Sequence, residues 1–419
     1  MALYHKRARP LFPRRKRRAR HTKPKPRLGL QRGWQATFPQ RGPRSVTDPQ
    51  TRQVTCLARR FLRVWLRPKA ALWSKLPVVS CALAACAMLA GCGSPMNEVL
   101  VTAPAVPGGD IIIRVATAQN EDPYDAGKAA ALALREQLGD ATPHIILVSE
   151  CYPERYLKKR ALRGVFAVFE PEKVFGCATY GTFAQSGALD RDAIGLMAIA
   201  GPGISVAAAL QTGLGTARLT PGEDDEEIQT LLNAAGERLA RRIPRTPQDK
   251  VLVTVADAHS PKNAHLVKGL QDELGKDFPI TGGCANKNAG QTYVYYRGDM
   301  YRDSAVAIML SGDFKVALSG RMAKTNEAVI ASAKEGAAEA AKALGGKPIA
   351  ALAFNCAGRK GKLDDIQDEL AAMQQALGKS LPLFGCYCAG EIGPADQAEK
   401  TEALSSGVGW HVMFTLLGR

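Results

Sequence analysis

The residues of this chain whose types and spacing could support chemistry lie near its C-terminus, at Cys386, Cys388 and Glu391. Side chains two residues apart in a strand point to the same face, so the two thiols could be oxidised together or bind a metal. A Cys-x-Cys pair supplies only two of the four ligands that a structural zinc needs, and we therefore expect no metal here. Glu391 follows Gly390, and a carboxylate beside such open backbone could accept a hydrogen bond from an ammonium or hydroxyl group of a ligand.

These residues belong to the last of three internal repeats. Each repeat contains an apolar strand, a polar loop, a helix and a short apolar strand that ends in a Gly-Cys pair. The first strands are expected at 145–149, 251–256 and 349–354, and the helices at 156–162, 264–274 and 363–377. The pairs end at Cys177, Cys284 and Cys386, about 32, 33 and 37 residues after the start of each repeat. Three copies of nearly one length predict three similar structural units.

Alternating apolar segments follow each Gly-Cys turn and predict antiparallel strands. Further helices are expected at 125–138, 223–241 and 327–344, where apolar periodicity ends at basic residues or glycines. The sequence therefore predicts an α/β fold, a layered sandwich of mixed sheets with helices, built from strand-helix-strand-meander repeats.

The three turns predict a ligand-binding crevice if they meet at one end of the sheets, because their backbone amides and small side chains would then line it. In this hypothesis Glu391 contacts the ligand and two asparagines add hydrogen bonds. The alternative is that Cys177 and Cys284 are small buried core residues and that Glu391 caps a local turn. The predicted ligand-binding residues are Cys177, Cys284, Asn286, Asn355, Cys386, Cys388, Gly390 and Glu391.

Motifs of common enzyme classes are missing from the sequence, including G-x-S-x-G, H-E-x-x-H and the Walker loop. We therefore expect a binding protein rather than an enzyme and assign no catalytic residue. A haem-based or thiol-redox sensor is the alternative, and a cysteine enzyme with a nucleophile next to Glu391 is less favoured. Because C-x-x-C-H is absent, covalent haem is not expected. The cofactor is left unknown, with haem b held by a histidine still open. The candidates are His144, His259, His265 and His411.

An apolar run ending in Leu89-Ala90-Gly91-Cys92 follows a basic stretch and resembles a bacterial lipoprotein signal, in which the cysteine is acylated. The run is too short to span a bilayer of ~30 Å. We expect residues 1–91 to be a basic leader and signal peptide, and residues 92–109 to be a tether. The protein would then sit in the cell envelope, periplasmic or at the outer membrane, held there by its lipid. An uncleaved apolar anchor or a misread N-terminus is the alternative.

The basic residues are concentrated in the leader. Residues 1–91 carry 22 of the 56 lysines and arginines but only one acid, which leaves 34 basic and 38 acidic residues downstream. The net charge of +17 is thus a property of the leader, while the remainder is mildly acidic. This distribution argues against nucleic acid as a partner.

The segment Pro382–Pro394, PLFGCYCAGEIGP, resembles the hallmark of the C-terminal part of the FIST family, a prokaryotic sensory domain. The turns VFGCATYG and ITGGCANKNAG resemble those of its N-terminal part, and the resemblance extends over about residues 110–416. It implies a FIST N-terminal domain at 110–322 and a FIST C-terminal domain at 323–419.

The resemblance implies a sensory domain that binds a small molecule, such as an amino acid or a similar polar metabolite, in signal transduction. One branch of the family is described as haem-binding and responsive to nitric oxide. Because no kinase, cyclase or chemotaxis module follows the domain, a separate signalling protein is the expected partner. Tyr180-Gly181-Thr182 stands where the family often has Ala-Gly-Glu, so only the third copy keeps its carboxylate, at Glu391.

Overall fold

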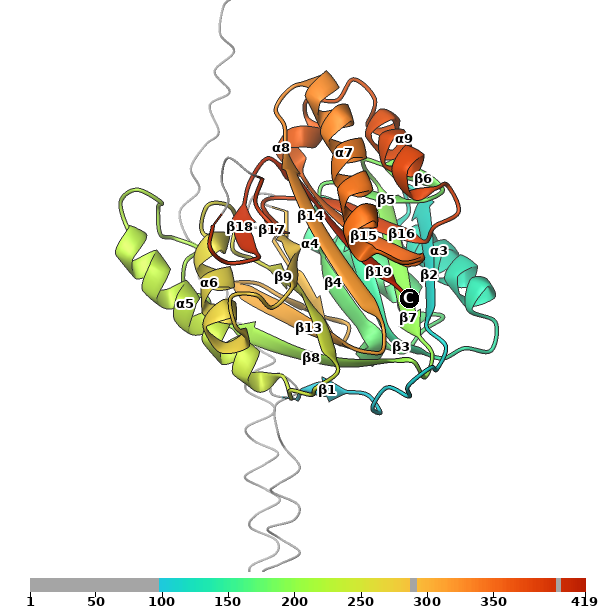
Figure 1. Cartoon of the computed structure of the whole chain (residues 1–419). Helices are drawn as coiled ribbons and strands as arrows, with labels where there is room; N and C mark the ends of the chain where they lie inside the picture. The colour runs from blue at the N-terminus through green and yellow to red at the C-terminus, as the bar shows by residue number, and fades with distance from the viewer. Residues whose placement is uncertain (1–97, 287–291, 397–400) are drawn as a thin grey trace, which may run out of the picture. The chain divides into compact units, whose positions relative to one another are not determined.

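The computed structural model describes residues 98–286, 292–396 and 401–419 (Figure 1). The leader, the lipoprotein signal and residues 92–97 of the predicted tether, Cys92 among them, lie outside these residues, and what the sequence indicates about them remains a prediction. Within the described ranges, no helix is long and apolar enough to cross a membrane. The described residues form seven α-helices and three mixed sheets, which confirms the predicted layered α/β architecture.

Three consecutive units share one order of elements: strand, helix, strand, helix, strand, short hairpin, strand. The first unit comprises β2 (Ile112–Gln119), α3 (Pro123–Leu138), β3 (Pro143–Glu150), α4 (Arg155–Phe166), β4 (Val174–Ala178), β5 (Thr182–Ala184), β6 (Gly187–Leu189) and β7 (Ala193–Ala200). The second comprises β8 (Ile204–Thr212), α5 (Asp225–Arg242), β9 (Asp249–Ala256), α6 (Asn263–Leu274), β10 (Ile280–Cys284), β11 (Val294–Tyr296), β12 (Asp299–Tyr301) and β13 (Ser304–Gly312). The third comprises β14 (Lys315–Met322), α7 (Asn326–Leu344), β15 (Pro348–Cys356), α8 (Ala357–Lys360), α9 (Ile366–Leu377), β16 (Leu383–Cys388), β17 (Glu391–Gly393), β18 (Ser406–Val408) and β19 (His411–Gly418).

The four long strands of each unit pair in the same spatial order, namely first, last, second and third. This gives β2-β7-β3-β4, β8-β13-β9-β10 and β14-β19-β15-β16. The second and third strands are parallel and joined by a helix, whereas the other pairs are antiparallel. The predicted repeat is therefore a real structural repeat, and each copy is one sheet with its helices.

The short hairpins are exchanged between units. The β5–β6 hairpin of the first unit pairs with β16, the β11–β12 hairpin of the second pairs with β4, and the β17–β18 hairpin of the third pairs with β10. A two-residue strand, β1 (Leu100–Val101), adds to the outer edge of β8. Because every sheet is completed by a hairpin of another unit, the three units cannot be separated without breaking a sheet. The predicted domain boundary after residue 322 leaves β14 in the first domain, although β14 pairs with β19 of the third unit.

Helices cover one face of each sheet, and the opposite faces meet in the centre. Figure 1 shows α5 and α6 over the sheet that contains β8, β13 and β9, and α7 and α9 over the sheet that contains β14, β19 and β15. The central core joins buried side chains of all three sheets, such as Phe175, Ile308 and Phe354. Three outer cores lie between each sheet and its own helices.

Close helix contacts account for glycines in the middle of helices. A Cβ on Gly127 of α3 would lie 2.0 Å from the carbonyl oxygen of Ala161 in α4, and a Cβ on Gly236 of α5 would lie 2.3 Å from that of Leu266 in α6. The cost of glycine within a helix is thus offset by the close packing that it allows. The helices expected at 125–138, 223–241 and 327–344 are confirmed as α3, α5 and α7.

Candidate functional site

The three turns that follow β4, β10 and β16 contact one another, which is the condition that the crevice hypothesis requires. Three equivalent backbone hydrogen bonds join them in a closed ring. Tyr180 N donates to Tyr387 O (2.8 Å), Asn286 N to Ala178 O (2.8 Å) and Ala389 N to Cys284 O (3.1 Å). Each turn is therefore held by the other two, and a displacement of one turn strains bonds in both neighbours.

The ring also fixes which residues are equivalent, and it corrects one expectation. Cys284 occupies the position of Ala178 and Tyr387, whereas Cys177 and Cys386 are matched by Gly283. The strand registers agree, since Val148 pairs with Gly176, Thr254 with Gly282 and Ala353 with Gly385. The sequence alignment on Gly-Cys pairs was therefore wrong by one residue in the second copy.

The register is set by the glycine that precedes the equivalent positions Cys177, Gly283 and Cys386. A Cβ on Gly176 would lie 2.0 Å from Val148 O, and one on Gly282 would lie 1.8 Å from Thr254 O, so glycine is needed at that point of the strand. The second copy has two adjacent glycines, and the sequence alone does not show which of them meets this need. As a result the Cys284 thiol points away from the central core and donates to Ala258 O at 3.0 Å.

Cys177, Cys386 and Cys388 lie together in the central core. The Sγ atoms of Cys386 and Cys388 are 3.5 Å apart, and a Cβ on Gly283 would lie 2.4 Å from Cys388 Sγ, so these sulfurs fill the space between the turns. Burial raises the pKa of the Cys177 thiol well above its usual value, and the Cys386 thiol together with burial does the same for the pKa of Cys388. Such thiols are packing groups rather than thiolate nucleophiles.

Glu391 begins β17 and is fully buried. Its Oε2 accepts a hydrogen bond from the backbone N–H of His411 at 3.0 Å, while Oε1 has no hydrogen-bond partner among the described residues. Burial raises the pKa of this carboxyl well above its usual range, because the ionised form loses its hydration. Burial thus disfavours the ionised form of Glu391.

Cys356 is a neighbour of Glu391 that the sequence did not indicate. It ends β15 and is 9% exposed, and its thiol lies close enough to the Glu391 carboxylate to affect its pKa without forming a hydrogen bond to Oε1. Burial and the nearby Glu391 charge raise the pKa of Cys356 to about 11. Cys356 is thus the member of this cluster that reaches the surface, in its neutral thiol form.

Asn355, by contrast, does not join Glu391. It pairs with Tyr387 and Val412, which both belong to the outer core under the helices, and strand alternation places Asn355 on that same face. It is fully buried, and both polar atoms of its amide have no partner among the described residues. The predicted role of Asn355 beside the carboxylate therefore finds no geometric support.

Two further predicted residues hold the turns together. Asn286 donates from Nδ2 to Thr179 O at 3.1 Å and thus ties the second turn to the first. Gly390 has φ +144°, and a Cβ there would lie 2.8 Å from Ser260 N, so this position needs glycine for its fit against the second unit. Their observed contacts are structural.

Two of the histidines considered for haem, His411 and His144, have ring nitrogens within hydrogen-bond distance of backbone groups. The Nε2 atom of His411 accepts from the backbone N–H of Asp396 (3.1 Å), so Nδ1 carries the proton and donates to Gly409 O (2.8 Å). His144 Nε2 is 2.8 Å from Gly201 O. Within the described ranges, no group of three or more His, Cys, Asp and Glu side chains is arranged to hold a metal ion.

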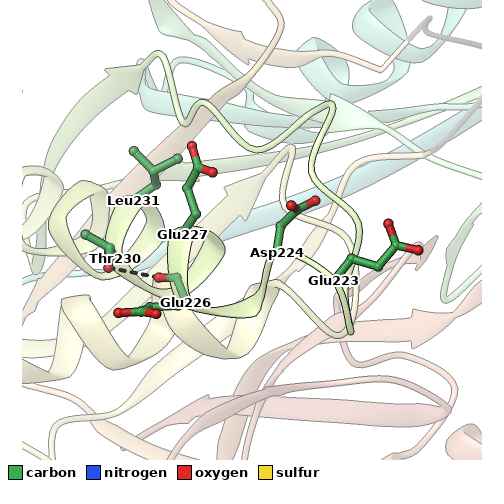
Figure 2. Close-up of a pocket in the computed structure, with 6 residues that line it drawn as sticks. All are labelled: Glu223, Asp224, Glu226, Glu227, Thr230 and Leu231. Carbon is green, nitrogen blue, oxygen red and sulfur yellow. Dashed lines mark hydrogen bonds between the residues drawn. The ribbon is translucent and has the colours of Figure 1, made fainter.

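Five hollows of about 300 to 590 Å³ open on the described part of the molecule, and none of these five is lined by Glu391, Cys386, Cys388 or Gly390. One of about 490 Å³ lies at the start of α5 and is lined mainly by carboxylates (Figure 2). Figure 2 shows that Glu226 points away from Glu223 and Asp224, so the carboxylates do not converge on one point. They lie where acidic side chains favour the positive end of a helix dipole. None of these five hollows therefore gives access to the buried Glu391 carboxylate.

Comparisons with known proteins agree with the sequence resemblance. The profile of the FIST N domain matches residues 144–337, and that of the FIST C domain matches residues 287–394. The chain belongs to the FIST family. FIST domains are sensory domains, so a role in signal transduction is consistent with the family.

No curated protein matches this chain. Among solved structures, cyanuric acid hydrolase of A. caulinodans aligns over 74% of this chain and 100% of its own, with 10% identity and a TM-score of 0.39. T. maritima PurL complexed with ATP aligns over 77% and 73%, with 8% identity and a TM-score of 0.24. These similarities are too low to indicate an activity.

Proposed function

We propose that this protein is a sensory, ligand-binding member of the FIST family that recognises a small polar molecule, such as an amino acid, at Glu391 without converting it. The observation that carries the proposal is the buried, unpartnered Oε1 of Glu391. Leaving such a group unsatisfied costs about 1–3 kcal/mol. A ligand that donates a hydrogen bond to Oε1 would recover this cost, and an ammonium group would also favour the ionised carboxylate.

Glu391 is fully buried in this structure, so ligand binding requires the third turn to open. Opening would break the bonds that tie this turn to its neighbours, among them Cys284 N to Gly390 O (2.8 Å) and Ser260 N to Ala389 O (3.1 Å). A ligand that binds only the open form shifts the equilibrium between the two forms. Ligand binding at Glu391 would thereby change the positions of all three turns. A sensory protein needs such a coupling between ligand binding and conformation.

Thermal shift on the full chain tests the proposal, with single amino acids and small amines as probes. A ligand of the native state stabilises by about 2.7 kcal/mol at 100 times its Kd, and we expect a concentration-dependent rise in Tm for a subset of these probes. Glu391→Gln should abolish that rise, whereas Glu335→Gln on the exposed side of α7 should preserve it. An identical rise for wild type and Glu391→Gln would overturn the assignment.

A thiol-redox sensor is the second candidate, favoured by the 3.5 Å separation of the Cys386 and Cys388 sulfurs. Oxidation by a disulfide or peroxide would form an S–S bond, with loss of two protons and two electrons to that oxidant. Mass spectrometry of the oxidised, non-reduced protein would show this bond. A cysteine enzyme is not favoured, because burial and the Glu391 charge raise the pKa of the Cys356 thiol to about 11, far above the range of a reactive thiolate.

For localisation we propose a lipoprotein of the cell envelope, anchored through Cys92. The support is the Leu-Ala-Gly-Cys sequence after an apolar run and a basic stretch. Cys92→Ala should release the protein from the membrane fraction and remove the lipid mass. Unchanged membrane retention of this variant would contradict the anchor.

A further inference from the structure

Each sheet contains one junction between a helix and an exchanged hairpin, and the three junctions are equivalent. They join α4 to β11–β12, α6 to β17–β18 and α9 to β5–β6, because in each case the helix precedes the strand to which the hairpin pairs. The side chains at these equivalent junctions differ, so the three junctions can be compared with one another.

Amide side chains close two of these junctions. In the second sheet Gln271 of α6 donates to Ser405 O at 2.7 Å, just before β18. In the third sheet Gln367 of α9 donates to Ala188 O at 2.7 Å, and Gln374 donates to Gln185 O at 2.6 Å. These bonds hold the helix and the hairpin together without a ligand.

The junction in the first sheet is built differently. Helix α4 has the sequence RYLKKRALRGVF and contains no asparagine or glutamine, so no side-chain amide of this helix closes the junction. A groove of about 380 Å³ lies at this junction instead. Its lining residues are Arg155, Lys159, Leu162, Arg163, Phe166, Gly298, Asp299, Met300 and Tyr301.

Cations line one side of this groove. Arg155, Lys159 and Arg163 are spaced four residues apart, so they share one face of α4, and all three are exposed. Neither Lys159 nor Arg163 forms an ion pair with an acid in the part of the chain that the structure describes. Arg160 on the adjacent face differs, since it contacts Asp122 at 2.6 Å.

Apolar side chains form the rest of the groove. Leu162 is buried, and Phe166, Met300 and Tyr301 are partly buried, so their surfaces remain accessible from the groove. Burying this apolar surface against a ligand would contribute about 25 cal/mol per Å². Asp299 is the one acid in the lining of this groove, and the cations outnumber it.

We propose that the α4–β12 groove binds a free anionic amphiphile, a molecule with a carboxylate or phosphate head and an apolar body of about ten carbons. The head would contact Lys159 and Arg163 by charge-assisted hydrogen bonds, and the body would lie on Phe166, Met300 and Tyr301. The volume of the groove falls within the usual range of small-molecule sites. This site is separate from Glu391 and does not depend on the function proposed above.

The test uses the full chain and isothermal titration with decanoate below its micelle concentration. Decyltrimethylammonium, which has the same tail and the opposite charge, is the control ligand and should not bind at this site. Lys159→Gln/Arg163→Gln should weaken decanoate binding at least about tenfold, which corresponds to ~1.4 kcal/mol. Met300→Glu, which places a carboxylate on the groove floor, should weaken it as well. Lys128→Gln, an exposed lysine of α3 outside the groove, should leave it unchanged.

Because residues 1–91 are strongly basic, the readout is the difference between variants rather than binding alone. Equal decanoate affinity in wild type and the double variant would overturn the proposal. A double variant that loses binding to phosphatidylglycerol vesicles but keeps its decanoate affinity would indicate a membrane surface instead, and would also overturn it. Both side chains are exposed, so the variant should fold normally, and its unchanged Tm serves as the control.

Discussion

Replacing Glu391 by glutamine should change the pH dependence of stability in a direction that the structure fixes. The pKa of this carboxyl is raised in the folded protein by burial, so the folded state holds a proton that the unfolded chain releases. Stability contributed by this proton is fully present below the unfolded pKa and is lost as the pH rises toward the folded pKa. Glutamine has the shape of the protonated acid and does not titrate.

The magnitude follows from proton linkage. One bound proton makes the free energy of unfolding fall by about 1.4 kcal/mol per pH unit between the two pKa values. Glu391 is fully buried, so solvent does not screen this effect. Relative to wild type, Glu391→Gln should therefore gain about 1.4 kcal/mol per pH unit above roughly pH 4.5, and should match wild type below it.

Urea denaturation of both proteins at pH 4 to 8 measures this difference, since other titrating groups are common to the two.

Asp249→Asn is an informative contrast. Burial acts to raise the pKa of Asp249, but hydrogen bonds from Arg245, Thr246 and Ser311 hold it below its usual value. The asparagine variant should lose stability relative to wild type as the pH rises toward the usual aspartate pKa of 3.8, so this comparison is measured below pH 4. If the difference between Glu391→Gln and wild type does not vary with pH, the carboxyl is ionised in the folded protein and the reasoning fails.

Two other substitutions test the packing and the buried charges. Gly282→Ala places a Cβ 1.8 Å from Thr254 O at φ +148°, so it should prevent folding or lower the free energy of unfolding in urea by several kcal/mol. Gly187→Ala is the control. No atom lies within 4 Å of its added Cβ, so it should change stability by less than about 0.5 kcal/mol. Lys158→Met leaves Glu150, which lies 3.2 Å from the ammonium group, buried without its partner and should cost about 3–5 kcal/mol. A cost below about 1 kcal/mol, measured in the same way, would show that Glu150 is neutral or solvated in the folded state.

The ring of turns gives a physical basis for the coupling that we propose for the Glu391 site. The three turns exchange backbone hydrogen bonds, and each sheet is completed by a hairpin of another unit. Movement of the third turn therefore acts directly on the first and second units. Packed interfaces of this kind favour discrete alternative arrangements over gradual deformation.

Local features of the sequence were enough to predict the elements and their repetition. The period of apolar residues, the polar loops and the glycines after β4, β10 and β16 depend on neighbours in sequence, and they gave the strand-helix-strand order of each copy correctly. The resemblance of Pro382–Pro394 to the FIST family likewise rests on a short segment. The convergence of the turns also followed from the repeat, since equal units place equal turns at equal positions.

Which face each residue occupies was decided only by the tertiary structure. A shift of one residue moves a strand side chain to the opposite face. Two adjacent glycines left the register of Cys284 undetermined in the sequence, and only the close approach of Gly282 to Thr254 O in the structure decided it. Asn355 falls on the outer face for the same reason of alternation. Lys158 is buried against Glu150 because that position of α4 faces the sheet, which the local sequence does not show. The exchange of hairpins has no local signal at all, because pairing between distant strands depends on contacts that exist only in the folded protein.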